Sequence, residues 1–438
     1  MNADAVSPFL GSIARGHAAV AASLAAPGAT AQVRRAALDR FLAAGLPTTR
    51  DENWKYLILR SLARRELPIS ATCAPLASLP RGILSLPDAA RLVFVNGRLD
   101  AALSTPSHKR VGLRIESLTE SYRRQPELLA HALPADDRAD SRFALLNTAF
   151  VADGASIEFG GGAAPLVYVV FLATGNEASF PRLRIHATGG STGIVVEHHI
   201  GDTGGACFVN SLAEIDVDGG SRVELCRLHA LEAGGQQFDT LRARVAAGST
   251  FAMDSLAVAG DVLRSDVDIS LEGAAAAGQL RGLLFTSGSQ HHELHAEIRH
   301  GVPQTTSRTE VRTVVNDGGR AICNSKVIVA PGANRSSSEQ NFRNLLLAPG
   351  AEADTRPQLE IHNEDVKCSH GASTGRLDPN QLFYLTTRGI DAATARALLT
   401  HAFVVDLLRA VPVPALASAL AQRLAGELPT RDLIKEFI

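Results

Sequence analysis

A thiol and an imidazole two residues apart form the most informative pair of reactive side chains in this sequence. Cys368 and His370 lie just after an extended run, Arg356–Ile361. Residues i and i+2 of an extended backbone point to the same face, so the two side chains can meet one metal ion or one facing subunit together. Thiolate and imidazole suit iron, zinc or an iron–sulfur species better than magnesium or calcium. Lys367, if it lies close, would favour the Cys368 thiolate.

Two ligands do not complete a metal site. A partner chain or a transient cluster would have to supply the remaining ligands. Most isolated cysteine and histidine residues are structural, so the spacing alone leaves a packing role open.

The histidine-rich run Gln290–His295 is a second candidate. On a strand, His291, Glu293 and His295 would share one face. The run resembles the HExxH pattern of zinc proteases, but its second histidine comes one residue too early. We therefore expect a polar, solvated strand face here, with metal contact as the minor alternative, and the same for His198-His199.

Other catalytic motifs are missing from the sequence. The glycine-rich stretches form neither GxxxxGK[ST] nor a strand-bound GxGxxG, and there is no GxSxG elbow. No nucleotide site or hydrolase triad is indicated.

The composition bounds the class of protein. The 438 residues are 45% hydrophobic and 20% charged, which is ordinary for a soluble globular protein. A net charge of −2 offers no field that would recruit nucleic acid or an anionic membrane. The five cysteines are scattered, odd in number and without a CxxC, which fits a reducing compartment. With no signal peptide and no apolar run long enough to span a bilayer, we expect a soluble, cytoplasmic chain.

The chain divides into three regions. Residues 1–150 mix helical patterns, over 33–42 and 143–150, with a hairpin over 93–99 whose Asn-Gly suits a type I′ turn. Residues 151–376 carry short alternating runs, and residues 377–438 turn helical again. In the last region, Asp378-Pro379 and Asp391 are helix-start signals, and Gly389 is a terminator. The apolar stripes of these helices either pack on the chain's own core or leave one face free for a partner.

A turn unit recurs in the middle region, in which a small residue follows glycine. The units are Asp153–Ser156, Asp218–Ser221, Ala247–Ser249, Glu272–Ala274, Pro331–Ala333 and Pro349–Ala351. Stacked short strands with such corners are what a β-solenoid needs. The spacing is irregular, so a β-sandwich stays an equal alternative on this pattern alone.

The C-terminal third closely resembles the SufB/SufD family of iron–sulfur cluster assembly scaffolds. The resembling block runs from Ser325 to Phe403, and Glu52–Tyr56 looks like the family's Trp-Lys-Tyr segment. The motifs in the block are Asn344–Leu347, Ala353–Ile361, Asp365–Ala372, Phe383–Leu385 and Arg388–Ile390. The Cys-Ser-His-Gly-Ala form around His370 is similar to the SufD branch, whereas the SufB branch typically carries a Glu-His-Glu-Ala type of sequence.

The resemblance implies a mainly β fold, with a right-handed parallel β-helix core over 151–376 between helical N-terminal (1–150) and C-terminal (377–438) regions. It implies a non-enzymatic subunit of a cytoplasmic complex with a SufB-like paralogue and a SufC-like ABC ATPase, the latter docking on the C-terminal helices. The residue matching His370 is implicated in nascent cluster assembly at the SufB interface, with Cys368 the weaker candidate. The implied cofactor is a transient iron–sulfur cluster or iron; a flavin at the level of the complex and a homodimer of the isolated chain stay open.

Two alternatives differ in class. A SufB-like subunit would itself accept sulfur, and a cysteine of the isolated chain would then carry persulfide. A β-helix carbohydrate-active enzyme would bind oligosaccharide and need no ATPase, but the aromatic residues that stack on sugars are scarce in this chain.

Overall fold

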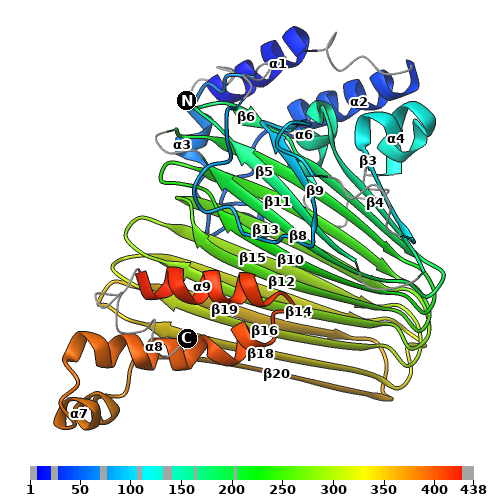
Figure 1. The fold of residues 1–438 in the computed structure, drawn as a ribbon. Helices are drawn as coiled ribbons and strands as arrows, with labels where there is room; N and C mark the ends of the chain where they lie inside the picture. Colours follow the sequence, from blue (N-terminus) through cyan, green and yellow to red (C-terminus); the bar gives the residue numbers. More distant parts are fainter. Residues whose placement is uncertain are drawn as a thin grey trace.

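The computed structural model describes residues 7–20, 28–69, 76–105, 111–131, 141–161, 165–201 and 205–426. Its centre is a solenoid of two facing sheets (Figure 1). The first sheet runs from edge to edge through β2 (Arg98–Leu99), β1 (Ala90–Val95), β5 (Leu166–Ala173), β8 (Thr192–Gly201), β10 (Arg222–Ala230), β12 (Thr250–Ala259), β14 (Ala277–Thr286), β16 (Thr306–Val315), β18 (Ser336–Leu346) and β20 (Val366–Gly375). The second runs through β19 (Glu352–Ile361), β17 (Arg320–Val329), β15 (His291–His300), β13 (Val262–Leu271), β11 (Gln236–Val245), β9 (Phe208–Val217), β7 (Arg182–Thr188), β4 (Gly154–Gly160) and β3 (Leu113–Ser117), with β6 (Ala178–Ser179) also on β9.

The chain alternates between the two sheets from β7 to β20, and each strand pairs in parallel with the strand two further along. Antiparallel pairs occur only at the beginning of the described sheets, between β1 and β2 and between β3 and β4. This connectivity is that of a parallel β-helix. The predicted solenoid is therefore confirmed, and the β-sandwich alternative is wrong.

The corners of neighbouring coils require glycine for two different reasons. Gly248 has a φ of +65°, a conformation that costs a residue with a Cβ, and its amide donates to the Ala274 carbonyl of the next corner at 2.9 Å. At Gly273 the limit is space, because an added Cβ would lie 2.0 Å from the Ala247 nitrogen. The Gly-small pattern in the sequence thus reflects stacking of one corner on the next.

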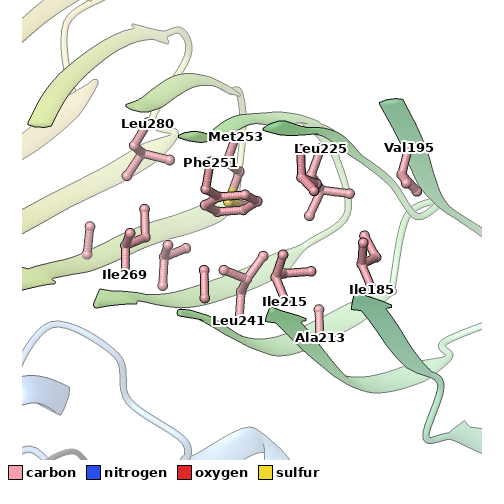
Figure 2. Close-up of a cluster of buried hydrophobic side chains, with 14 of the residues drawn as sticks. Ile185, Val195, Ala213, Ile215, Leu225, Leu241, Phe251, Met253, Ile269 and Leu280 are labelled. Atoms are coloured by element: carbon pink, nitrogen blue, oxygen red, sulfur yellow. The ribbon is translucent and has the colours of Figure 1, made fainter. Parts of the chain in front are cut away.

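The interior of the solenoid is a continuous apolar core. Figure 2 shows side chains from both sheets pointing toward one another, among them Ile215, Leu241, Phe251, Met253 and Ile269. All five are almost completely buried. Alternate residues of each strand supply this core, since successive side chains of a strand point to opposite faces.

Helices of the N-terminal region cover the outer face of the second sheet. They are α1 (Pro8–Val20), α2 (Gly28–Ala44), the 3₁₀ turn η1 (Glu52–Trp54), α3 (Arg60–Ala63), α4 (Leu118–Arg124), α5 (Glu127–His131) and α6 (Arg142–Phe150). Phe9, Phe41 and Phe143 pack with Phe208 and Phe238 of the sheet in one cluster. The helices predicted over 33–42 and 143–150 are confirmed, and so is the Asn-Gly hairpin turn, whose two residues both have positive φ.

The C-terminal helices are α7 (Pro379–Thr387), α8 (Ala392–Arg409) and α9 (Pro414–Gly426). The Asp378 and Asp391 side chains accept hydrogen bonds from the first turns of α7 and α8, so both predicted caps are confirmed. α8 and α9 cover the outer face of the first sheet, where Leu407 and Leu420 pack with Val196 and Leu256.

Residues 427–438 of the predicted C-terminal region and Cys73 lie outside the described residues. The other four cysteines are free thiols. Among the helices that the structure describes, none is long and apolar enough to cross a membrane.

Candidate functional site

Strand β20 places Cys368 and His370 at the end of the solenoid remote from the N-terminal helices (Figure 1). Within the described residues, β20 pairs with β18 alone, and its outer edge is unpaired. Cys368 lies beside Ser338 in the ladder, and His370 lies beside Gln340. The Val366 and Cys368 side chains pack on the edge of the interior core. Every second residue of a strand points to the same face, so the His370 side chain also faces the end of the solenoid interior. Cys368 is half-buried and His370 is exposed.

Burial raises the pKa of the Cys368 thiol, and a hydrogen bond from the Ser338 backbone offsets part of that effect. Lys367 is not among the groups that shift this pKa. Neighbouring residues of a strand point to opposite faces, which keeps the Lys367 side chain away from the sulfur. This environment therefore disfavours the Cys368 thiolate, which is the form of cysteine that binds a metal.

The described residues contain no group of three or more His, Cys, Asp or Glu side chains placed to hold a metal ion. A thiol and an imidazole on an unpaired edge strand can bind a metal firmly only if a facing chain adds ligands. The pair by itself is not a complete metal site.

The interior beneath this edge contains buried polar side chains, which the local sequence pattern did not reveal. The Gln340 amide nitrogen donates to the Gln358 carbonyl at 3.1 Å. The Asn344 amide nitrogen donates to Thr374 of β20 at 2.9 Å, and its oxygen accepts from Thr313 at 2.7 Å. Buried polar and apolar side chains thus alternate with each other behind the row that carries Cys368 and His370, since Phe342 of the apolar core lies between Gln340 and Asn344.

The histidine-rich run is mostly buried, with only 15% and 11% of the His291 and His295 side chains exposed, contrary to the prediction of a solvated face. The Glu293 carboxylate contacts the His291 ring nitrogen at 2.7 Å, the His295 ring nitrogen at 2.8 Å and the Arg264 guanidinium at 2.8 Å. Burial alone would raise the pKa of Glu293, but the hydrogen bonds from His291 and His295 and the charge of Arg264 hold it well below its usual range. These side chains form a closed ion cluster.

That cluster fastens the Glu52–Tyr56 segment to the solenoid. Arg264 donates to the Asn53 carbonyl at 2.7 Å, and its guanidinium carbon lies 3.8 Å from the centroid of the Trp54 ring. Arg320 contacts the Tyr56 carbonyl, and Arg356 of β19 pairs with Glu52 at 3.1 Å. The Trp-Lys-Tyr motif is therefore a clamp between regions far apart in sequence.

His198 and His199 are also buried, so the expectation of a solvated pair is wrong. They lie on β8, which is covered on both faces. The Tyr168 hydroxyl lies 2.8 Å from the His198 ring on the outer face. On the inner face, Glu197 contacts His199 and Arg227, both at 2.8 Å. Arg227 and His199 hold the pKa of Glu197 at about 2, although burial opposes them.

Helix α7 presents an uncovered apolar surface. None of its residues is buried, and Phe383 and Tyr384 are 70% and 58% exposed. In Figure 1 the helix lies beyond α8, away from the sheets. A hollow of about 330 Å³ between α7 and α8 is lined by Asn380, Gln381, Tyr384, Leu385 and Leu399. Of the C-terminal helices, α7 is thus the one whose apolar side chains do not pack on the chain's own core.

Comparison with known proteins agrees with this architecture. Residues 170–403 match the family described as "SUF system FeS cluster assembly, SufBD core domain", and residues 25–158 match "SufBD protein N-terminal region". The chain belongs to the SufBD family of iron–sulfur cluster assembly proteins.

Among individual relatives, the chain is similar to the iron–sulfur cluster assembly protein SufD of Escherichia coli, with 28% identity over 90% of this chain and 92% of that protein. A SufBD family protein of Synechocystis is 26% identical over 89% of each chain. The chloroplastic protein ABCI7 of Arabidopsis thaliana is 29% identical over 51% of this chain and 47% of its own length. The predicted resemblance, including its SufD character, is confirmed.

Proposed function

We propose that the chain is a scaffold subunit of a SUF-type assembly complex, without catalytic activity of its own. It presents His370, with Cys368, to a nascent iron–sulfur cluster at an interface with a SufB-like paralogue. The observation that carries this proposal is a soft ligand pair on an edge strand with no closed ligand set around it. A cluster under construction has to be held and then released, and a site completed by a second chain permits both.

The unpaired edges of β19 and β20 suit a partner with the same fold. Both strands are ten residues long, and their outer edges are unpaired among the described residues. Long uncovered edges readily accept another strand, so a paralogous solenoid can continue both sheets. The same edges permit a homodimer when the paralogue is missing.

The second docking surface is α7, for a SufC-like ABC ATPase. Its exposed Phe383 and Tyr384 are the kind of aromatic anchors that dominate protein interfaces. We assign the region over 377–438 to this docking, the region over 151–376 to the β-helix, and the region over 1–150 to the clamp on its outer face. We also propose that the complex lies in the cytoplasm. ATP-driven movement of the ATPase would then strain the interface that carries His370.

Co-expression of the tagged chain with its genomic neighbours, followed by pull-down and anaerobic reconstitution with iron and sulfide, tests the proposal. An ATPase and a paralogous partner should be recovered, with cluster absorption that weakens in His370→Ala. The matched control is His362→Ala, which removes another exposed imidazole at the same end of the solenoid, just after β19, whose ring nitrogen lies 3.0 Å from the Glu360 carboxylate. Equal absorption in both variants would contradict the role of His370. Persulfide on Cys368 of the isolated chain would favour the SufB-like alternative.

A further inference from the structure

Gln340 lies directly behind His370 and carries an unused hydrogen-bond acceptor. The two residues are ladder partners on β18 and β20, so their side chains project from neighbouring strands to the same side. Gln340 is 1% exposed, and its Oε1 has no hydrogen-bond partner in the described structure. A buried acceptor of this kind costs free energy unless a donor reaches it.

The orientation of this amide is determined by its other end. The Gln340 Nε2 atom lies 3.1 Å from the Gln358 carbonyl oxygen, which can only accept a hydrogen bond. The amide nitrogen must therefore face Gln358, and Oε1 is the atom left for another donor. The His370 ring does not donate to Oε1 in the described structure, but His370 is exposed and one strand away, so rotation of its side chain can bring a ring N–H to this acceptor.

A histidine that binds a metal nearly always donates its other ring N–H to a fixed acceptor, which sets the tautomer and the ring orientation. We propose that Gln340 is the positioning residue for His370: its Oε1 accepts one ring N–H of His370 and leaves the other ring nitrogen with its lone pair for iron. This assignment rests on the proposed function, because it gives His370 the role of an iron ligand.

The test uses the full chain with labelled histidine and the Gln340→Met variant, which keeps the length of the side chain and removes the acceptor. The matched control is Gln237→Met, since Gln237 is also a buried glutamine, 2% exposed, on β11. The imidazole nitrogen resonances in the NMR spectrum of the metal-free chain report the tautomer of each histidine. The resonances that disappear in His370→Ala are those of His370. We expect one tautomer in the parent and in Gln237→Met, and a mixture in Gln340→Met.

Binding of ferrous iron to the assembled complex is the second measurement. Gln340→Met should weaken it by about 10- to 100-fold, as is usual when the partner of a ligating histidine is lost. An unchanged His370 tautomer in Gln340→Met overturns the positioning role of Gln340. Unchanged iron affinity in Gln340→Met also overturns it, if His370→Ala abolishes iron binding. If His370→Ala leaves iron binding intact while Gln340→Met still mixes the tautomers, the proposed function fails and the hydrogen bond stands.

Discussion

Arg264 is expected to hold the N-terminal clamp on the solenoid, and its loss should release Trp54. The side chain is 2% exposed and contacts Glu293, Asp266 and the Trp54 ring. Arg264→Met removes the buried cation and leaves the Glu293 carboxylate without its guanidinium partner. Breaking one side of a buried ion pair costs about 3–5 kcal/mol. Loss of the cation–π contact with Trp54 adds about 1–2 kcal/mol.

The sequence provides its own probe, because Trp54 is the single tryptophan of the chain. Its fluorescence reports the clamp, while far-ultraviolet circular dichroism reports the solenoid. With a urea slope of about 2 kcal/mol/M, a loss of about 4 kcal/mol moves the fluorescence midpoint down by about 2 M. The circular dichroism transition of the solenoid should move much less, so the two probes separate.

A surface arginine supplies the control for this experiment. The Arg244 side chain is 58% exposed and pairs with Asp216 at 2.8 Å on the same sheet. Exposed pairs contribute about 0–1 kcal/mol, so Arg244→Met should shift the midpoint by less than about 0.5 M. The double variant Arg264→Met/Glu293→Met, which removes both buried charges, should recover part of the loss. A fluorescence midpoint for Arg264→Met that matches Arg244→Met would refute the clamp.

Three further outcomes follow from the same contacts. The pKa of Glu293 is depressed in the folded chain. The stabilisation of the fold by ionised Glu293 is therefore complete above the pKa of about 4.3 that a glutamate has in an unfolded chain, and it is lost as the pH falls below that value. As the pH is lowered from roughly 5 to 3, the urea midpoint of the Trp54 fluorescence transition should therefore decrease in the parent and decrease less in Glu293→Gln. The same decrease in both proteins would contradict this expectation. Burial raises the pKa of Cys207 to about 11 and of Cys323 to about 12. Mass spectrometry after brief alkylation at neutral pH should therefore find the label on Cys368 and not on these two cysteines. Equal labelling of all three would show that the interior opens. Phe383→Glu should leave thermal unfolding of the chain unchanged, because this side chain is exposed, yet reduce ATPase capture in the pull-down; capture equal to the parent would remove α7 from the interface.

The architecture was predictable because each local signal agrees with the global fold. The Asp378 and Asp391 caps, the Asn-Gly turn and five of the six Gly-small corners formed as the sequence predicts; the exception is Asp153–Ser156, where Gly154 already begins strand β4. The resemblance decided between solenoid and sandwich, since short alternating strands suit both. Register came only from the structure.

The histidine predictions failed because burial of a strand's outer face is a long-range property. Alternation along β15 correctly puts His291, Glu293 and His295 together, but the Trp54 segment that covers them is more than two hundred residues earlier in the chain. His198 fails for a similar reason, since α8 and α9 cover the outer face of the sheet that contains β8. Gln340 was missed because it becomes a neighbour of His370 only through the pairing of β18 with β20.

The two ends of the solenoid differ in a way that bears on function. At the beginning, the short antiparallel strands β2 and β3 terminate the sheets. At the other end, β19 and β20 keep their full length, and their side chains are half-buried or exposed. Uncovered edges of this length invite aggregation unless a partner covers them. Cys368 and His370 lie on that edge, so the pairing that protects it would also bring a second chain's ligands to them. Under the proposed function, structural stability and cluster chemistry would then depend on the same interface.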